Sequence, residues 1–104
     1  MQALIDALNA TGYAFVHFGW SKAPDAEYGV YAEERGADFE ADGRHAEKAT
    51  TGTIDYFTRD DSATPRTTIE SAINGVCAAW YLNSIQYEND TGLIHYEWVF
   101  YVYG

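Results

Sequence analysis

The sequence contains very little cysteine: Cys77 is the only one among 104 residues. A single cysteine cannot form an intramolecular disulfide, and it excludes a metal site built from several cysteines. A lone thiol fits a reducing cytoplasm. Cys77 falls on the apolar side of a predicted helix, so we expect it to act as a small buried hydrophobic residue.

Long hydrophobic runs are also missing. No stretch approaches the roughly 20 apolar residues that a membrane-spanning helix needs, and the first residues lack the basic segment and apolar run of a signal peptide. We therefore expect no membrane partner. Internal repeats and low-complexity segments are absent as well, and the length predicts a single domain over residues 1–104.

Cations are scarce. Six Lys and Arg face sixteen Asp and Glu, which gives a formal net charge of −10 at pH 7. Because phosphate backbones are bound by cationic side chains, direct binding of nucleic acid is not expected. Most of the surplus lies between residues 25 and 61. Such a surplus is typical of a solvated surface, and it also fits a patch for a basic partner or a passage to which DNA must not adhere.

Catalytic and metal-binding motifs are lacking too. The three histidines show no i, i+4 helical spacing and form no HExxH motif. The serines lie in no nucleophile-elbow pattern. The alternating Asp38, Glu40 and Asp42 lack the glycine and the final Glu of an EF-hand loop. We therefore predict that the chain is not an enzyme and has no catalytic residues, no cofactor and no metal.

Aromatic residues are abundant, with nine Tyr, five Phe and three Trp. They are densest from Leu93 to Tyr103, where a strand would direct alternate side chains to opposite faces. The face suited to a core consists of Ile94, Tyr96, Trp98, Phe100 and Val102. The other consists of His95, Glu97, Val99, Tyr101 and Tyr103. That second face is too aromatic to meet only water, so we predict that it contacts another surface through Tyr101 and Tyr103.

Periodicity and turn residues predict the order helix, strand, strand, strand, helix, strand, strand. The first helix is predicted over residues 2–11. The second starts with Thr64 as N-cap and Pro65 at the first helical position, and one of its faces carries Ile69, Ala72, Ile73, Val76, Cys77 and Trp80. Strands are predicted over residues 13–18, 28–33, 50–59, 81–88 and 93–103, the last two joined by a turn at residues 89–92.

The segment between the second and third strands is the hardest to interpret. Its simplest form is a long β-hairpin with its tip near Asp42-Gly43, a favoured turn pair. Two amphipathic helices cannot bury themselves alone, so they should cover one face of the sheet. The predicted fold class is therefore α+β: two helices packed on one face of a mostly antiparallel or mixed β-sheet, with a long projecting β-hairpin. The connection through the second helix fits a crossover, right-handed if the strands that it joins are parallel.

This layout resembles that of the small phage tail-terminator and tail-completion proteins, also called head–tail joining proteins. The resemblance is carried by residues 4–8 in the first helix, by residues 52–59 before the Thr64-Pro65 helix start, and by the terminal hairpin from Trp80 to Tyr103. It spans nearly all of the chain, although residues 36–48 stay unaligned because this loop varies in length within the family. The chain also resembles small proteins encoded in prophage structural clusters.

The resemblance implies a non-enzymatic virion structural subunit that forms a homo-oligomeric ring, commonly a hexamer, at the head–tail junction. Such a ring terminates the tail tube and joins it to the head connector, so the tail-tube protein and the connector or adaptor protein are the implied partners. DNA passes through without specific binding. The subunit would be made in the cytoplasm of the host bacterium. Interface or lumen candidates on the projecting hairpin are Phe39, Glu40, Asp42, Arg44 and His45.

Two other functions stay open from the sequence. The first is an acidic inhibitor or DNA mimic, whose carboxylates would occupy the basic site of a nucleic-acid-binding partner. The second is a small enzyme or ligand-binding domain, which would need a polar pocket with perturbed carboxylates.

Overall fold

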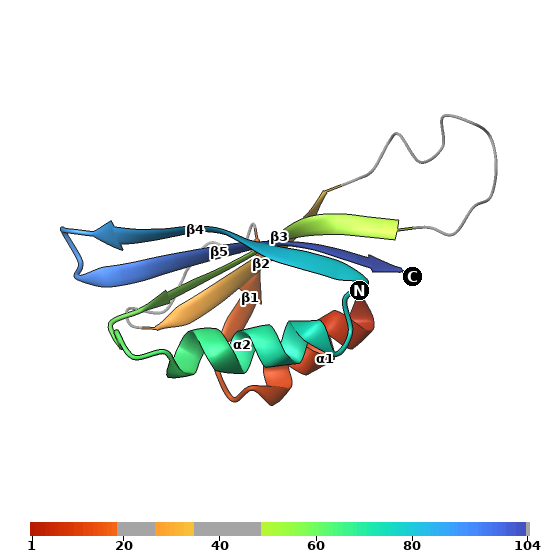
Figure 1. Cartoon of the computed structure of the whole chain (residues 1–104), viewed down its shortest axis with the longest axis horizontal. Helices are drawn as coiled ribbons and strands as arrows, with labels where there is room; N and C mark the ends of the chain where they lie inside the picture. The colour runs from red at the N-terminus through yellow and green to blue at the C-terminus, as the bar shows by residue number, and fades with distance from the viewer. Residues whose placement is uncertain (19–26, 35–48, 104) are drawn as a thin grey trace.

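The computed structural model describes residues 1–18, 27–34 and 49–103, which form two helices and a five-stranded mixed sheet (Figure 1). The helices are α1 (Gln2–Ala10) and α2 (Thr64–Asn74). The strands are β1 (Phe15–His17), β2 (Tyr28–Glu34), β3 (Ala49–Thr58), β4 (Ala79–Glu88) and β5 (Leu93–Tyr103). The predicted element order and the α+β class are confirmed.

The strands are arranged in the order β1-β2-β3-β5-β4. β1 pairs with β2 in parallel, and the other three pairs are antiparallel. Because β3 and β4 are both antiparallel to β5, they run parallel to each other with β5 between them. The connection through α2 is thus a crossover that passes over one strand. β1 and β4 form the two edges of the sheet.

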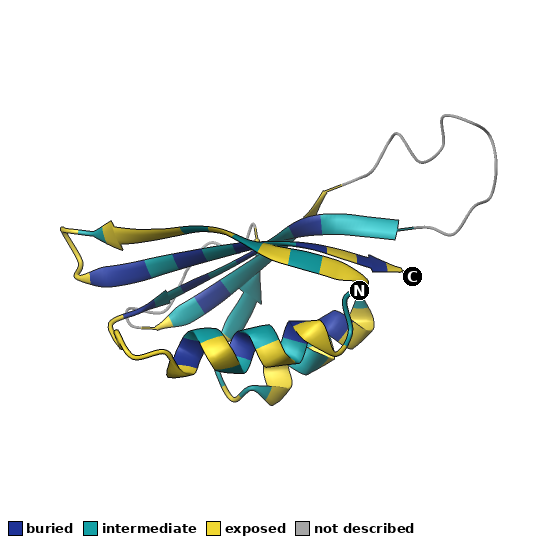
Figure 2. Ribbon diagram, viewed as in Figure 1, coloured by how far each residue is buried: buried dark blue, intermediate teal, exposed yellow. Residues whose placement is uncertain are grey.

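The core lies between the helices and one face of the sheet. Both helices run along the same side of the sheet in Figure 1, and the buried positions alternate along β3 and β5 in Figure 2. A single buried cluster joins Leu4 and Leu8 of α1, Ile69 and Ile73 of α2, Ile54 and Tyr56 of β3, and Ile94, Tyr96, Trp98, Phe100 and Val102 of β5. The core face predicted for residues 93–103 is therefore confirmed.

Trp98 is the largest fully buried side chain of the described residues. Its cross-strand neighbours are Ile54 and Leu82, so its ring lies near the middle of the sheet. The indole Nε1 donates a 2.9 Å hydrogen bond to Oε2 of Glu70, and the same oxygen accepts a 2.9 Å hydrogen bond from Nε of Arg66. The one polar atom of the buried indole is thereby satisfied by α2, which links the helix to the sheet.

The second helix starts and ends earlier than the sequence predicts. Its N-cap is Ala63 rather than Thr64, and Pro65 falls at its second position. The backbone N–H of Thr64 donates to Oγ of Ser62, which stands in the preceding loop. At the other end α2 stops at Asn74, so Cys77 lies beyond the helix and Trp80 lies in β4.

The early helix end has a clear cause in the sheet. The backbone N–H of Ala78 donates a 2.8 Å hydrogen bond to the carbonyl oxygen of Tyr101, so the chain joins β5 within four residues of the helix end. The apolar residues after Gly75 match helical spacing, but strand pairing with β5 decides their conformation.

Glycines stand at two turns, and the second of these is the turn predicted at residues 89–92. Gly12 follows α1 with φ of +87°, and Gly92 closes the β4–β5 hairpin with φ of +73°. The N–H of Gly92 donates a 2.8 Å hydrogen bond to the carbonyl oxygen of Glu88. β2 and β3 pair from Tyr28–Phe57 to Glu34–Thr51. The hairpin tip predicted near Asp42-Gly43 lies outside the described residues.

We expect Trp98→Ala to lower the free energy of unfolding by roughly 3–5 kcal/mol, because it empties the centre of the core and removes the indole donor from Glu70. Urea denaturation followed by far-UV circular dichroism measures this. Tyr103→Ala is the matched control on the same strand, since its side chain is largely exposed. A loss for Trp98→Ala no greater than for Tyr103→Ala would show that the two faces of β5 are swapped.

Candidate functional site: the helix-free face of the sheet

The face of the sheet turned away from α1 and α2 carries the most distinctive chemistry of the chain. Directly paired residues of neighbouring strands point to the same side of a sheet. The registers therefore define this open face by Tyr28, Val30, Ala32 and Glu34 of β2, Thr51, Thr53, Asp55 and Phe57 of β3, His95, Glu97, Val99, Tyr101 and Tyr103 of β5, and Tyr81, Ser84 and Gln86 of β4.

A row of rings crosses one end of the open face. Tyr28, Phe57 and His95 are direct cross-strand partners on three adjacent strands. The Tyr28 and Phe57 ring centroids are 4.8 Å apart at an interplanar angle of 20°, and those of Phe57 and His95 are 4.2 Å apart at 24°. Stacking of this kind stabilises a sheet beyond the burial of area.

Two carboxylates lie side by side in the next row. Asp55 and Glu97 are direct cross-strand partners, an arrangement in which like charges repel. Each has a polar partner: His95 Nε2 lies 2.7 Å from Asp55 Oδ1, and Asn83 Nδ2 donates a 2.9 Å hydrogen bond to Glu97 Oε1. Burial and the Glu97 charge raise the pKa of Asp55, while the contact with His95 opposes that shift.

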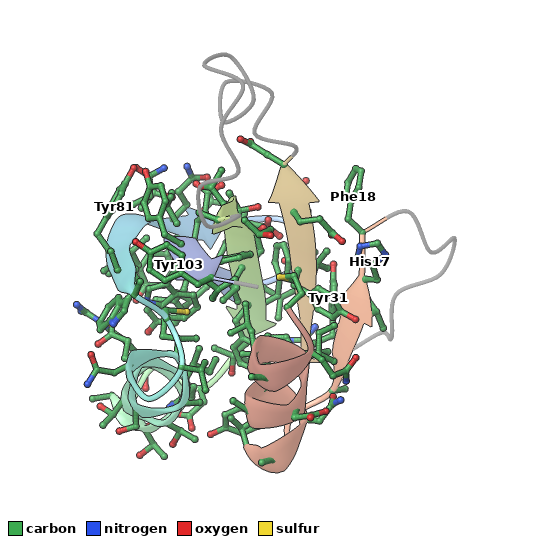
Figure 3. All side chains as sticks on the ribbon, turned by 90° about the vertical axis from the view of Figure 1, so that its right-hand side faces the viewer. His17, Phe18, Tyr31, Tyr81 and Tyr103 are labelled. Atoms are coloured by element: carbon green, nitrogen blue, oxygen red, sulfur yellow. The ribbon has the colours of Figure 1, made fainter. Side chains whose placement is uncertain are left out.

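The far end of the open face is aromatic and uncovered. Tyr101 has Thr51 and Ala79 as cross-strand neighbours, and Tyr103 has Ala49. These small neighbours cannot cover the phenol rings, so Tyr101 is 39% exposed and Tyr103 is 65% exposed. Tyr81 of β4 lies on the same face, and Figure 3 shows Tyr81 and Tyr103 near the same end of the sheet. This end offers an amphipathic contact surface.

The structure thus brings together two of the predicted interface residues, Tyr101 and Tyr103. The other candidates, Phe39, Glu40, Asp42, Arg44 and His45, lie outside the described residues, so their interface role stays a prediction. Sequence reasoning missed the Tyr28–Phe57–His95 stack and the Asp55–His95 contact. The partners come from strands 29 to 67 residues apart in the chain, and only the register of the folded sheet aligns them.

A second polar cluster lies at the β1 edge, on the same side of the sheet as the helices. His17 Nε2 is 2.6 Å from Glu33 Oε1, and its ring lies 5.1 Å from that of Tyr31. Figure 3 shows Phe18 projecting beside this group, and its side chain is exposed. His17 and His95 are both strand residues, as their position within the predicted strands indicated, and the structure gives each a carboxylate partner.

The charge of the described part is overwhelmingly negative. It holds eleven acids but only two cations, Arg59 and Arg66. None of its His, Cys, Asp and Glu residues gather in a group of three that could hold a metal ion.

Cys77 is half-buried against the core, and burial raises the pKa of its thiol to about 11. At neutral pH a thiol of this kind is protonated and a poor nucleophile.

Comparison with known proteins adds no family. The chain matches no protein-family model, and no curated protein matches it. Across residues 1–18, 27–34 and 49–103, no helix is both long and apolar enough to cross a membrane. The open face itself, aromatic at its ends and acidic between them, is therefore the candidate site.

The raised pKa of Asp55 predicts a specific pH dependence. The native state holds this proton to a higher pH than the unfolded chain does, so ionisation of Asp55 lowers the free energy of unfolding as the pH rises above 3.8, the ordinary value. Asp55→Asn should remove that loss, so wild type should lose more stability than Asp55→Asn over this range. Urea unfolding at a series of pH values measures the difference.

Asp60→Asn is the control of opposite sign. Hydrogen bonds with Ser62 lower the pKa of Asp60, so its contribution to stability is present above pH 3.8 and is lost as the pH falls below that value. A difference between wild type and Asp55→Asn that is independent of pH would contradict the environment described for Asp55.

Proposed function

We propose that this chain is a non-enzymatic structural subunit of a phage or prophage virion, and that it assembles into a ring, expected to be a hexamer, at the head–tail junction. There the ring would terminate the tail tube and join it to the head connector. The site of action is the virion, after synthesis in the bacterial cytoplasm. The likeness to tail-terminator proteins motivates this function, and the surface of the protomer supports it.

The observation that carries the proposal is the chemical division of β5. Ile94, Trp98 and Phe100 fill the core, whereas Tyr101 and Tyr103 stand exposed on a face that no helix of the described part covers. Tyrosine is enriched at protein interfaces because it is large, rigid and amphipathic. A heterologous contact between such a surface and a different surface of the next copy closes into a ring when the rotation allows it.

The proposal also covers how the helices and the hairpin are arranged within the subunit. α1 and α2 would form the layer on one side of the sheet, and β2 and β3 would extend through residues 35–48 as the projecting hairpin. Its residues Phe39, Glu40, Asp42, Arg44 and His45 would then reach a neighbouring subunit or the lumen. These positions stay predictions.

The negative charge of the described part supports a lumen that does not hold DNA. Like charges repel, so a wall rich in carboxylates lets a phosphate backbone slide past without specific binding. The alternative function, an acidic inhibitor or DNA mimic, would depend on the same surplus of negative charge. It is favoured less because Asp55 and Glu97, the adjacent carboxylates of the open face, already have His95 and Asn83 as partners.

Mass measurement tests the function directly. Native mass spectrometry of the purified chain should show a closed ring, expected to be a hexamer. Mass spectrometry of purified virions from a host that carries the gene should show the chain in the particle. A chain that stays monomeric at all concentrations and is missing from virions would contradict the proposal.

We expect the double substitution of Tyr101→Ala and Tyr103→Ala to weaken the oligomer while leaving the protomer folded, because both phenol rings are exposed. The free energy of unfolding should change by roughly 1 kcal/mol or less. Phe18→Ala is the matched control, since it removes an exposed ring from the β1 edge of the sheet, away from β5. Equal loss of assembly in both variants would remove Tyr101 and Tyr103 as the ring contact.

A further inference from the structure

β4 is an edge strand with an unusual surface. Among the described residues it pairs only with β5, so its other edge presents free backbone N–H and C=O groups along ten residues. Three of its large apolar side chains are exposed: Tyr81 by 50%, Ile85 by 46% and Tyr87 by 71%. Half of the exposed large hydrophobic side chains of the described part therefore belong to this one strand.

The strand lacks most of the features that keep edges unpaired. Proteins protect long edges with Lys, with Pro, with inward-pointing charges or with bulges. β4 contains no Lys, Arg or Pro, and its single charged residue, Glu88, stands at its end. Its only protective feature is a bulge at Asn83, where the register with β5 shifts between Leu82 and Ser84.

That bulge makes the strand symmetric rather than irregular. Before it, Trp80 and Leu82 pair with core residues of β5 and point to the helix side. After it, Ile85 and Tyr87 pair with core residues and point to the same side. The bulge thus exchanges odd and even positions halfway along the strand, so a reversed copy can pair with β4 in a register centred on the bulge with the two faces matched.

We propose that β4 is a self-association edge, which in the free protein pairs antiparallel with β4 of a second copy. The two-fold axis would pass through the bulge, perpendicular to the sheet. Leu82 would then face the second copy's Ile85, and Tyr81 would face the second copy's Gln86. In this register, residues that point to the helix side face each other, and so do residues that point to the open face. A register shifted by one residue would place helix-side residues opposite open-face residues.

The pairing is favourable in hydrogen bonds, apolar contacts and charge. A ten-residue antiparallel ladder adds about ten backbone hydrogen bonds, the number in a typical protein interface. The side chains of Leu82 and Ile85 meet on the helix side of both copies. The two Glu88 carboxylates lie at opposite ends of the ladder, each opposite Ala79. Parallel pairing in full overlap would place the two carboxylates next to each other, which is unfavourable.

This contact is independent of the proposed ring. A two-fold contact uses the same edge on both copies and closes after two chains, whereas a ring needs a heterologous contact. The proposal concerns the free protein and depends only on the edge of β4.

Disulfide trapping tests the register. In a Cys77→Ala background, the substitutions Tyr81→Cys and Gln86→Cys place cysteines opposite each other in the proposed pair, with Cα atoms about 5 Å apart, within reach of a disulfide. The two cysteines of one chain are five residues apart along an extended strand, too far to bridge. We expect mild oxidation to give a covalent dimer on a non-reducing gel.

The control is Tyr81→Cys with Tyr87→Cys, whose side chains point to opposite faces of the sheet. It should give at least about tenfold less dimer, because cysteines with diverging Cβ vectors cannot be bridged. Ala79→Cys with Glu88→Cys tests the same register at the strand ends. Circular dichroism checks that each variant is folded. No covalent dimer in either matched pair, or equal yields in matched and control pairs, would overturn the proposal.

A charge on the edge tests the pairing itself. Adding Ile85→Lys to the Tyr81–Gln86 cysteine pair should slow disulfide formation at least about tenfold, since a lysine on an edge strand opposes strand addition. Thr67→Lys adds the same charge at an exposed position of α2 and should leave the rate unchanged. Equal rates in the two lysine variants would also overturn the proposal.

Discussion

The structure depends on the strict alternation of β5, which pairs with β3 on one side and β4 on the other. Because successive side chains of a strand point to opposite faces, a shift of one residue in either register would expose Trp98 and bury Tyr101. The buried indole N–H of Trp98 also needs a hydrogen-bond acceptor, and Glu70 supplies one only when Trp98 points to the helix side. This constraint sets the core on one side of the sheet and the open face on the other.

The open face is organised by the same registers. Alignment of β2, β3 and β5 stacks Tyr28, Phe57 and His95, and it also brings Asp55 beside Glu97. Each carboxylate also has a polar partner, His95 for Asp55 and Asn83 for Glu97, which offsets part of the repulsion. The face is therefore acidic near its centre and aromatic at its ends. Two such faces would repel each other if they stacked directly, because their carboxylates would meet. A different surface of the next copy is therefore the better partner for the ring that we propose.

The helices, the final hairpin and the order of the seven elements could be predicted from the sequence, because they depend on local signals. Leu4 and Leu8 lie one helical turn apart, the Asn89–Gly92 turn separates two aromatic runs, and the predicted core positions alternate from Ile94 to Val102. The second helix was predicted too long because Cys77 and Trp80 continue its spacing. A hydrogen bond between Ala78 and Tyr101, far apart in the chain, draws the residues after Gly75 into the sheet instead.

The sequence alone thus determined that β5 has a core face and an aromatic face, and that the chain has far more carboxylates than cations, because both follow from residue type and spacing. Only the tertiary structure decided which strands lie next to each other. Strand order placed β5 inside the sheet and left β4 at an edge, brought His95 to Asp55 across 40 residues, and put the bulge at Asn83. Pairing between distant strands depends on the packing of the whole sheet, so the edge of β4 could not be identified before the fold was known.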